Sequence, residues 1–183
     1  MSKFTDNASE KLLVVAGKIS NQKHMASIKN AFYTLMPVIL TGAFCTLISN
    51  VVCSTTTTGI SLAKLPGMSW LGMFTDLFTA ANYATLNFFT VAAVFLIGME
   101  LAKQNGLGDS PDSGVVAVCS FISVLPTYVV TTVNDVQVTV PNVLGKDYTA
   151  ARGLFLGMVI ALVSVEIYSK FVKSHVFDFK MPD

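Results

Sequence analysis

The chain has 183 residues, of which 52% are hydrophobic and only 13% are charged, whereas a soluble domain devotes about a quarter of its residues to charge. The mean hydropathy is +0.62. The formal net charge of +1 at pH 7 lacks the basic excess that nucleic-acid-binding domains carry, so DNA and RNA are not expected partners. This composition excludes an ordinary soluble globule and favours a membrane protein.

Residues 1–30 form a lysine-containing leader before the first long apolar block. Within it, residues 5–20 have the pattern of a short amphipathic helix, with leucines that would face lipid and lysines that would face headgroups. We therefore predict a cytoplasmic amphipathic leader on the membrane surface. An ordinary solvated leader is the alternative interpretation.

Four long apolar blocks follow the leader, each of about 20 residues or more, which is enough to cross a bilayer as a helix. The blocks cover residues 31–53, 82–102, 114–133 and 149–171. A soluble bundle is the alternative, but its helices would show a polar stripe, and these blocks are apolar all round. The sequence predicts an all-α membrane protein with four transmembrane helices within residues 31–171 and a cytoplasmic tail over 172–183.

Residues 70–81 are apolar but too short to cross, and they contain Asp76. We interpret this stretch as an interfacial lead-in to the second span, with Trp70 at headgroup depth. If the stretch crosses the membrane together with its neighbour, the topology inverts downstream.

The distribution of basic residues predicts the orientation. Nine of the 12 Lys and Arg residues lie in the leader, in the connection after the second span, at the end of the fourth span or in the tail. The remaining three are Lys64, Lys146 and Arg152. By the positive-inside rule, we expect both ends of the chain to be cytoplasmic.

No residue pattern predicts catalysis, a cofactor or a metal site. Cys45, Cys53 and Cys119 lie in or beside apolar blocks without a CxxC pair, which is typical of packing cysteines. His24 and His175 lie far apart in the sequence and form no pair of histidines at helical ligand spacing. We therefore expect no catalytic residue, no cofactor and no metal.

Three polar residues stand within or at the edge of the spans: Asn50, Glu100 and Glu166. Such groups are costly in hydrocarbon unless they meet a partner or water. Glu166 precedes Lys170 by four residues and Glu100 precedes Lys103 by three, so intrahelical ion pairs near the interface are the simplest interpretation. For Asn50 we expect a hydrogen bond between helices.

Helix-breaking and small residues suggest where the spans bend and touch. Pro37 and Pro126 each remove a backbone donor, so kinks are expected in the first and third spans. Gly153 and Gly157 form a GxxxG step that lets another helix approach, either within one protomer or at a dimer contact. Residues 134–148 contain alternating valines that could pair as a small external hairpin.

Four segments resemble one family when taken together and in order. They are KISNQKHMASIKNAFYTLMPVILTGAFCTLISN (18–50), FLIGMELAKQ (95–104), GLFLGMVIALVSVEIYSKFV (153–172) and FDFKMPD (177–183). The combination resembles the amino-terminal part of the membrane subunit, IIC, of bacterial phosphotransferase-system (PTS) transporters for lactose, cellobiose and diacetylchitobiose.

This resemblance implies a homodimeric permease that passes a disaccharide to the cytoplasmic IIB subunit, which phosphorylates it with phosphate delivered through IIA. In that family the early helices form the scaffold and the dimer contact, while the sugar-binding residues belong to a later half. We therefore expect no substrate-binding residue in this chain, and disaccharide binding only with the missing half.

Two other functions remain open: a stand-alone scaffold or dimerisation fragment without transport activity, and an unrelated four-span transporter. The unrelated transporter would need a central polar site of its own.

Overall fold

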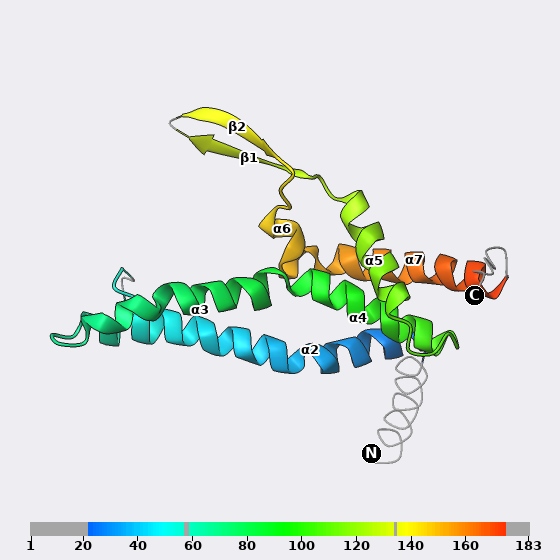
Figure 1. Ribbon diagram of the computed structural model, residues 1–183, viewed down its shortest axis with the longest axis horizontal. Helices are drawn as coiled ribbons and strands as arrows, with labels where there is room; N and C mark the ends of the chain where they lie inside the picture. The colour runs from blue at the N-terminus through cyan, green and yellow to red at the C-terminus, as the bar shows by residue number, and fades with distance from the viewer. Residues whose placement is uncertain (1–21, 57–58, 134, 175–183) are drawn as a thin grey trace, which may run out of the picture.

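The computed structural model describes residues 22–56, 59–133 and 135–174. The predicted leader helix over residues 5–20 and nearly all of the predicted tail lie outside these residues. Within them the chain is mostly helical, with one two-stranded hairpin (Figure 1).

The first span is a single long helix. It consists of α2 (Lys23–Leu47) and a π-helical turn (Ile48–Cys53), which together make 31 residues, long and apolar enough to cross a membrane. The helix begins before the predicted start at residue 31 and continues past Pro37. The hydroxyl of Thr41 donates a 2.8 Å hydrogen bond to the Pro37 carbonyl, in the turn after the proline.

The second membrane segment is longer than the block at 82–102 and is broken. After a 3₁₀ turn (Leu62–Lys64), a helical stretch runs from Ser69 to Asn87 and includes α3 (Thr75–Asn82). The chain then bends by 42° before α4 (Phe89–Gln104). A π-helical turn (Tyr83–Asn87) precedes the bend, and Phe88 leaves helical geometry at φ −103°, ψ 13°. Residues 70–81 are thus part of a helix that lies along the second half of α2 (Figure 1).

The third block differs from the prediction. Helix α5 (Pro111–Val124) ends well before residue 133, and Tyr128–Val133 is strand β1, which pairs antiparallel with β2 (Val136–Pro141). Pro126 therefore lies beyond the helix and does not kink it. A proline disfavours helical geometry in the residue before it, and Leu125 is extended at ψ 148°. The β-branched residues that follow favour a strand, so a hairpin forms earlier than the predicted 134–148.

The last part of the chain follows the predicted block at 149–171 closely. A single turn, α6 (Lys146–Thr149), and a 3₁₀ turn (Ala151–Gly153) lead into α7 (Leu154–Lys173). The uncharged run before Glu166 makes α7 apolar enough to cross.

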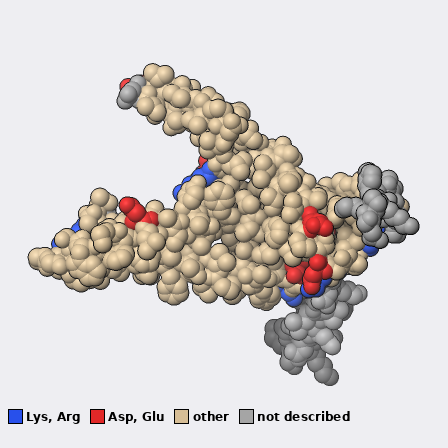
Figure 2. Space-filling view, viewed as in Figure 1, with Lys and Arg blue, Asp and Glu red and all other residues tan. Residues whose placement is uncertain are grey.

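Helix α4 lies at the centre of the bundle and packs against α2, α5 and α7 (Figure 1). Its residues Val94, Ile97 and Leu101 are fully buried, as are Phe121 of α5 and Val165 of α7. Many other large apolar side chains stay exposed, which suits a surface that meets lipid. Charged side chains gather in a few places on an otherwise uncharged body (Figure 2).

By length and composition, the described residues contain two helices that can cross a membrane, or three if the bent pair is one span. Helix α5 has 14 residues, about 21 Å at 1.5 Å per residue, which is shorter than the hydrocarbon layer of about 30 Å. Four full-length transmembrane helices, as expected from the sequence, are therefore not confirmed by the described residues.

Candidate functional site

One polar assembly joins three helices at one end of the bundle. We call it the end cluster: Lys23 and His24 of α2, Asn105 after α4, and Glu166 and Ser169 of α7. The Lys23 ammonium lies 2.5 Å from Glu166 Oε1 and donates to Asn105 Oδ1 at 3.0 Å. Asn105 Nδ2 in turn donates to Ser169 Oγ at 3.1 Å. The cluster thus ties the start of α2 to the ends of α4 and α7.

The partner of Glu166 is not the one the sequence suggested. Instead of pairing with Lys170 along its own helix, Glu166 pairs with Lys23 of another helix, and His24 Nδ1 lies 3.7 Å from the same oxygen. The glutamate side chain is 25% exposed and the Lys23 side chain is 44% exposed, so the pair lies at the edge of the helix contact and is only partly desolvated.

Glu100 also takes a partner from another helix. Asn30 Nδ2 of α2 donates to Glu100 Oε2 at 3.2 Å. Lys103, the expected partner of Glu100, forms an ion pair with Asp109 at 3.0 Å instead. Both glutamates therefore hold helices together in this structure.

A second polar assembly, which the sequence reasoning missed, runs between the end of the first span and α3. Thr75 Oγ1 donates to the Cys53 carbonyl at 3.0 Å, the Ser49 and Thr79 hydroxyls are 3.3 Å apart, and Asn82 Nδ2 donates to Thr46 Oγ1. Beyond these pairs, the Thr85 side chain packs against Gly42 and occupies the space that a Cβ at this position would need. We call this set of four pairs the polar zipper.

The polar zipper corresponds to a pattern in the amino-acid sequence. Its small or polar residues recur at spacings of three and four on both helices: 42, 46, 49 and 53 on one, and 75, 79, 82 and 85 on the other. Asn50 is not part of it. Its amide donates to the Thr46 carbonyl of its own helix at 2.9 Å, so the predicted bond between helices is made by Asn82 instead.

The two glycines of the GxxxG step make contacts within the chain. A Cβ on Gly157 would lie 2.7 Å from Val94 Cγ2 and 2.9 Å from Thr90 Cγ2, both on α4. A Cβ on Gly153 would collide with the Tyr148 backbone. Gly157 thus permits the close approach of α7 to the central helix.

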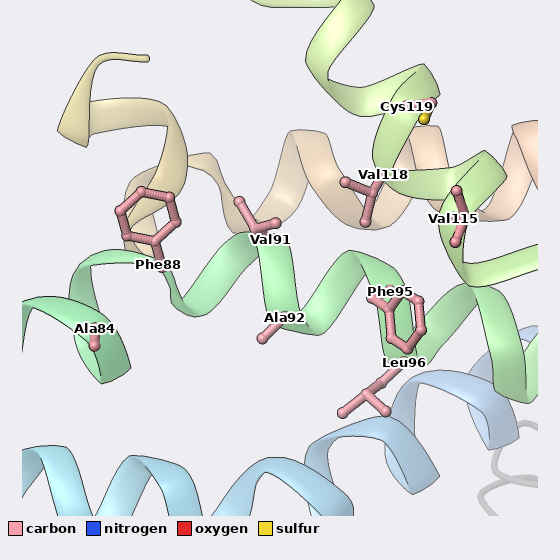
Figure 3. Close-up of a pocket in the computed structure, with 9 residues that line it drawn as sticks. All are labelled: Ala84, Phe88, Val91, Ala92, Phe95, Leu96, Val115, Val118 and Cys119. Atoms are coloured by element: carbon pink, nitrogen blue, oxygen red, sulfur yellow. The ribbon is translucent and has the colours of Figure 1, made fainter. Parts of the chain in front are cut away.

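The cavities on the bundle are mostly apolar. One of about 590 Å³ lies between α4 and α5 and is lined by Phe88, Phe95, Leu96 and Val118, among others (Figure 3). Cys119, the most exposed of the three cysteines, lies at its edge. A sugar site needs several convergent hydrogen-bonding groups, and this cavity lacks them. Among the described residues, no three His, Cys, Asp or Glu side chains are grouped to hold a metal.

Comparisons with known proteins agree on one family. The family model described as "Phosphotransferase system, EIIC" matches residues 29–183. The chain is 29% identical to the lichenan permease IIC component of Bacillus subtilis (strain 168) over 188 residues. It is 25% identical to the PTS system cellobiose-specific EIIC component of Geobacillus stearothermophilus over 187 residues. Each alignment covers 100% of this chain and 39% of the relative.

A solved structure gives the same result. The fold matches the crystal structure of the transporter ChbC, the IIC component from the N,N'-diacetylchitobiose-specific phosphotransferase system, with a TM-score of 0.75 and 26% identity over 95% of this chain and 39% of that one. The chain therefore spans about two fifths of the length of the proteins it matches. It corresponds to their amino-terminal part, and it belongs to the EIIC family of the phosphotransferase system.

Proposed function

We propose that the chain is the amino-terminal part of a PTS permease that carries a disaccharide such as cellobiose, diacetylchitobiose or lactose across the membrane. Phosphorylation by IIB, supplied through IIA, would accompany uptake. The observation that carries this proposal is the match to ChbC, which extends over 95% of the chain. Cellobiose and diacetylchitobiose stand in the names of two similar proteins; lactose comes from the sequence resemblance alone.

Within such a permease, these helices would serve as scaffold and as the contact between two copies in a homodimer. The main supporting observation is the apolar character of the large cavity between α4 and α5, which leaves sugar binding to other residues. The polar zipper and the end cluster hold helices to one another, as a scaffold requires.

For orientation, we propose that the end cluster lies at the cytoplasmic face of the bacterial inner membrane. Lys23, Lys103, Lys170 and Lys173 all stand near the ends of helices that meet there (Figures 1 and 2). An excess of lysine favours the cytoplasmic side. The β1–β2 hairpin would then lie on the outer side.

The test is uptake by the native host. The gene is deleted, and phosphoenolpyruvate-dependent uptake of radiolabelled cellobiose, diacetylchitobiose and lactose is compared with that of the parent and of a complemented strain. Glucose uptake is the control. Loss of uptake of one disaccharide, restored by the gene, is the expected result. Unchanged uptake of all three sugars would contradict the proposal.

The apolar character of the cavity is also compatible with the second function, a scaffold without transport activity. The intact mass of the product in its own membrane distinguishes the two. A product near 19.6 kDa whose deletion leaves uptake unchanged would be such a scaffold.

A further inference from the structure

Helix α7 carries a groove that the functions above do not use. Its first section, of about 320 Å³, is lined by His24 of α2 and by Leu162, Val163, Glu166 and Ile167 of α7. A second section, of about 300 Å³, is lined by Ile167, Lys170, Phe171 and Ser174. The two sections share Ile167, and we call them together the α7 groove.

The length of the groove fits one leaflet of a bilayer. From Leu162 to Lys170 the helix rises about 12 Å at 1.5 Å per residue, which lies within the roughly 15 Å of half of the hydrocarbon layer. The walls are apolar and open: Val163 is 54% exposed and Ile167 is 51% exposed. Because α7 is long and apolar enough to cross a membrane, these exposed side chains would meet hydrocarbon in a bilayer.

The charges change along the groove. Its far section carries Lys170, and Lys173 follows in the same last turn of α7. In the described part of the chain, neither lysine forms an ion pair. The one carboxylate in the groove, Glu166, is already paired with Lys23. An apolar channel that ends beside two lysines therefore complements an amphipathic molecule with a negative headgroup.

We propose that the α7 groove binds one anionic phospholipid, with an acyl chain along Val163 and Ile167 and the phosphate beside Lys170. Basic sites between membrane helices on the cytoplasmic side commonly take such lipids. A lipid in this place would cover the contact between α2 and α7 and would further stabilise the helix contact made by the end cluster. The proposal depends on membrane insertion and not on transport.

Quenching by brominated lipids tests the proposal. In a Trp70→Phe background, which removes the single native tryptophan, Ile167→Trp places a reporter in the groove. Phe155→Trp is the matched reporter at the other end of α7, where the native side chain is 75% exposed. Vesicles contain phosphatidylglycerol and phosphatidylcholine, with one or the other brominated. The ratio of the two quenching efficiencies gives the preference for the anionic lipid at each reporter.

We expect the groove reporter to prefer phosphatidylglycerol and the Phe155→Trp reporter to show a ratio near one. Lys170→Gln should lower the preference in the groove about fivefold, the effect of one lysine near an anionic surface. Lys146→Gln, at the N-terminus of the distant helix α6, is the control and should leave the ratio unchanged. Because a tryptophan in the groove can itself hinder binding, native mass spectrometry of the unmodified chain measures retained phosphatidylglycerol independently, with and without Lys170→Gln.

Several outcomes would overturn the proposal. Equal ratios at both reporters, or no response to Lys170→Gln in either measurement, would show that the groove does not select lipid charge. Loss of the preference on adding inorganic phosphate would indicate an anion site without a lipid. Quenching by neither lipid would show that a helix or a second copy of the chain covers the groove.

Discussion

The contact at Gly157 predicts that adding a single methyl group will loosen the bundle. In Gly157→Ala the new Cβ would lie 2.7 Å from Val94 Cγ2 and 2.9 Å from Thr90 Cγ2. Neither neighbour moves aside easily. Val94 is fully buried and β-branched, so its rotamer is restricted in a helix. Rotating the Thr90 methyl away would break the 2.6 Å hydrogen bond from Thr90 Oγ1 to the Ala150 carbonyl.

The net effect combines two opposing terms. Overpacking a core costs about 1–3 kcal/mol, whereas replacing glycine with alanine inside a helix gains about 1 kcal/mol. We therefore expect Gly157→Ala to lower the free energy of unfolding by about 1 kcal/mol. Gly145→Ala is the matched control: its φ is −66° and its nearest neighbour would be 3.4 Å away, so we expect a small gain.

A titration with sodium dodecyl sulfate in mixed micelles, followed by circular dichroism, measures these free energies. Val94→Ala removes the closest methyl group, so the double variant should be more stable than the sum of the single variants predicts, by about 1 kcal/mol. The steric account is refuted if the two substitutions are additive, or if Gly157→Ala is as favourable as Gly145→Ala.

Two further predictions concern the polar assemblies and use the same titration. Glu166→Gln removes the ion pair with Lys23 and should cost about 1 kcal/mol, between the values for exposed and buried pairs. Lys23→Met, which also removes the hydrogen bond to Asn105, should then cost less in the Glu166→Gln background than in the parent chain. Asn82→Ala removes the hydrogen bond to Thr46 and should cost about 0.6–2 kcal/mol, the range for such bonds between membrane helices.

Each polar variant has a control. Asp147→Asn breaks the well-exposed pair with Arg152 and should change stability by less than about 0.5 kcal/mol. Asn50→Ala removes a hydrogen bond within one helix and should have a similarly small effect. Equal losses in a variant and its control would show that the contact between helices contributes nothing.

The sequence predicted the apolar segments better than their secondary structure. Hydropathy located the block at 114–133, but it does not distinguish a buried helix from a valine-rich strand. Pro126 and the β-branched residues after it contained that information, since a proline disfavours helical geometry in the residue before it and β-branched residues favour strands. The break at Phe88 had no such marker, because residues 82–90 contain neither proline nor glycine.

The polar contacts were harder to predict for a physical reason. Local spacing suggested Lys170 as the partner of Glu166, whereas the structure pairs it with Lys23, 143 positions earlier in the chain. Which residues face each other across helices depends on how the helices pack, and a single sequence does not specify that. The polar zipper is the exception, because the amino-acid sequence itself contains small or polar residues at spacings of three and four on both of its helices.

The hairpin offers a site at which the orientation of the protein in the membrane can be measured. Strands β1 and β2 project away from the helices (Figure 1), and every residue of β2 is exposed. Exposed loop tips tolerate insertions, so a protease recognition sequence could be placed between Val133 and Val136 without disturbing the bundle. Cleavage in intact cells, or only in inverted vesicles, would then show which way the whole scaffold faces.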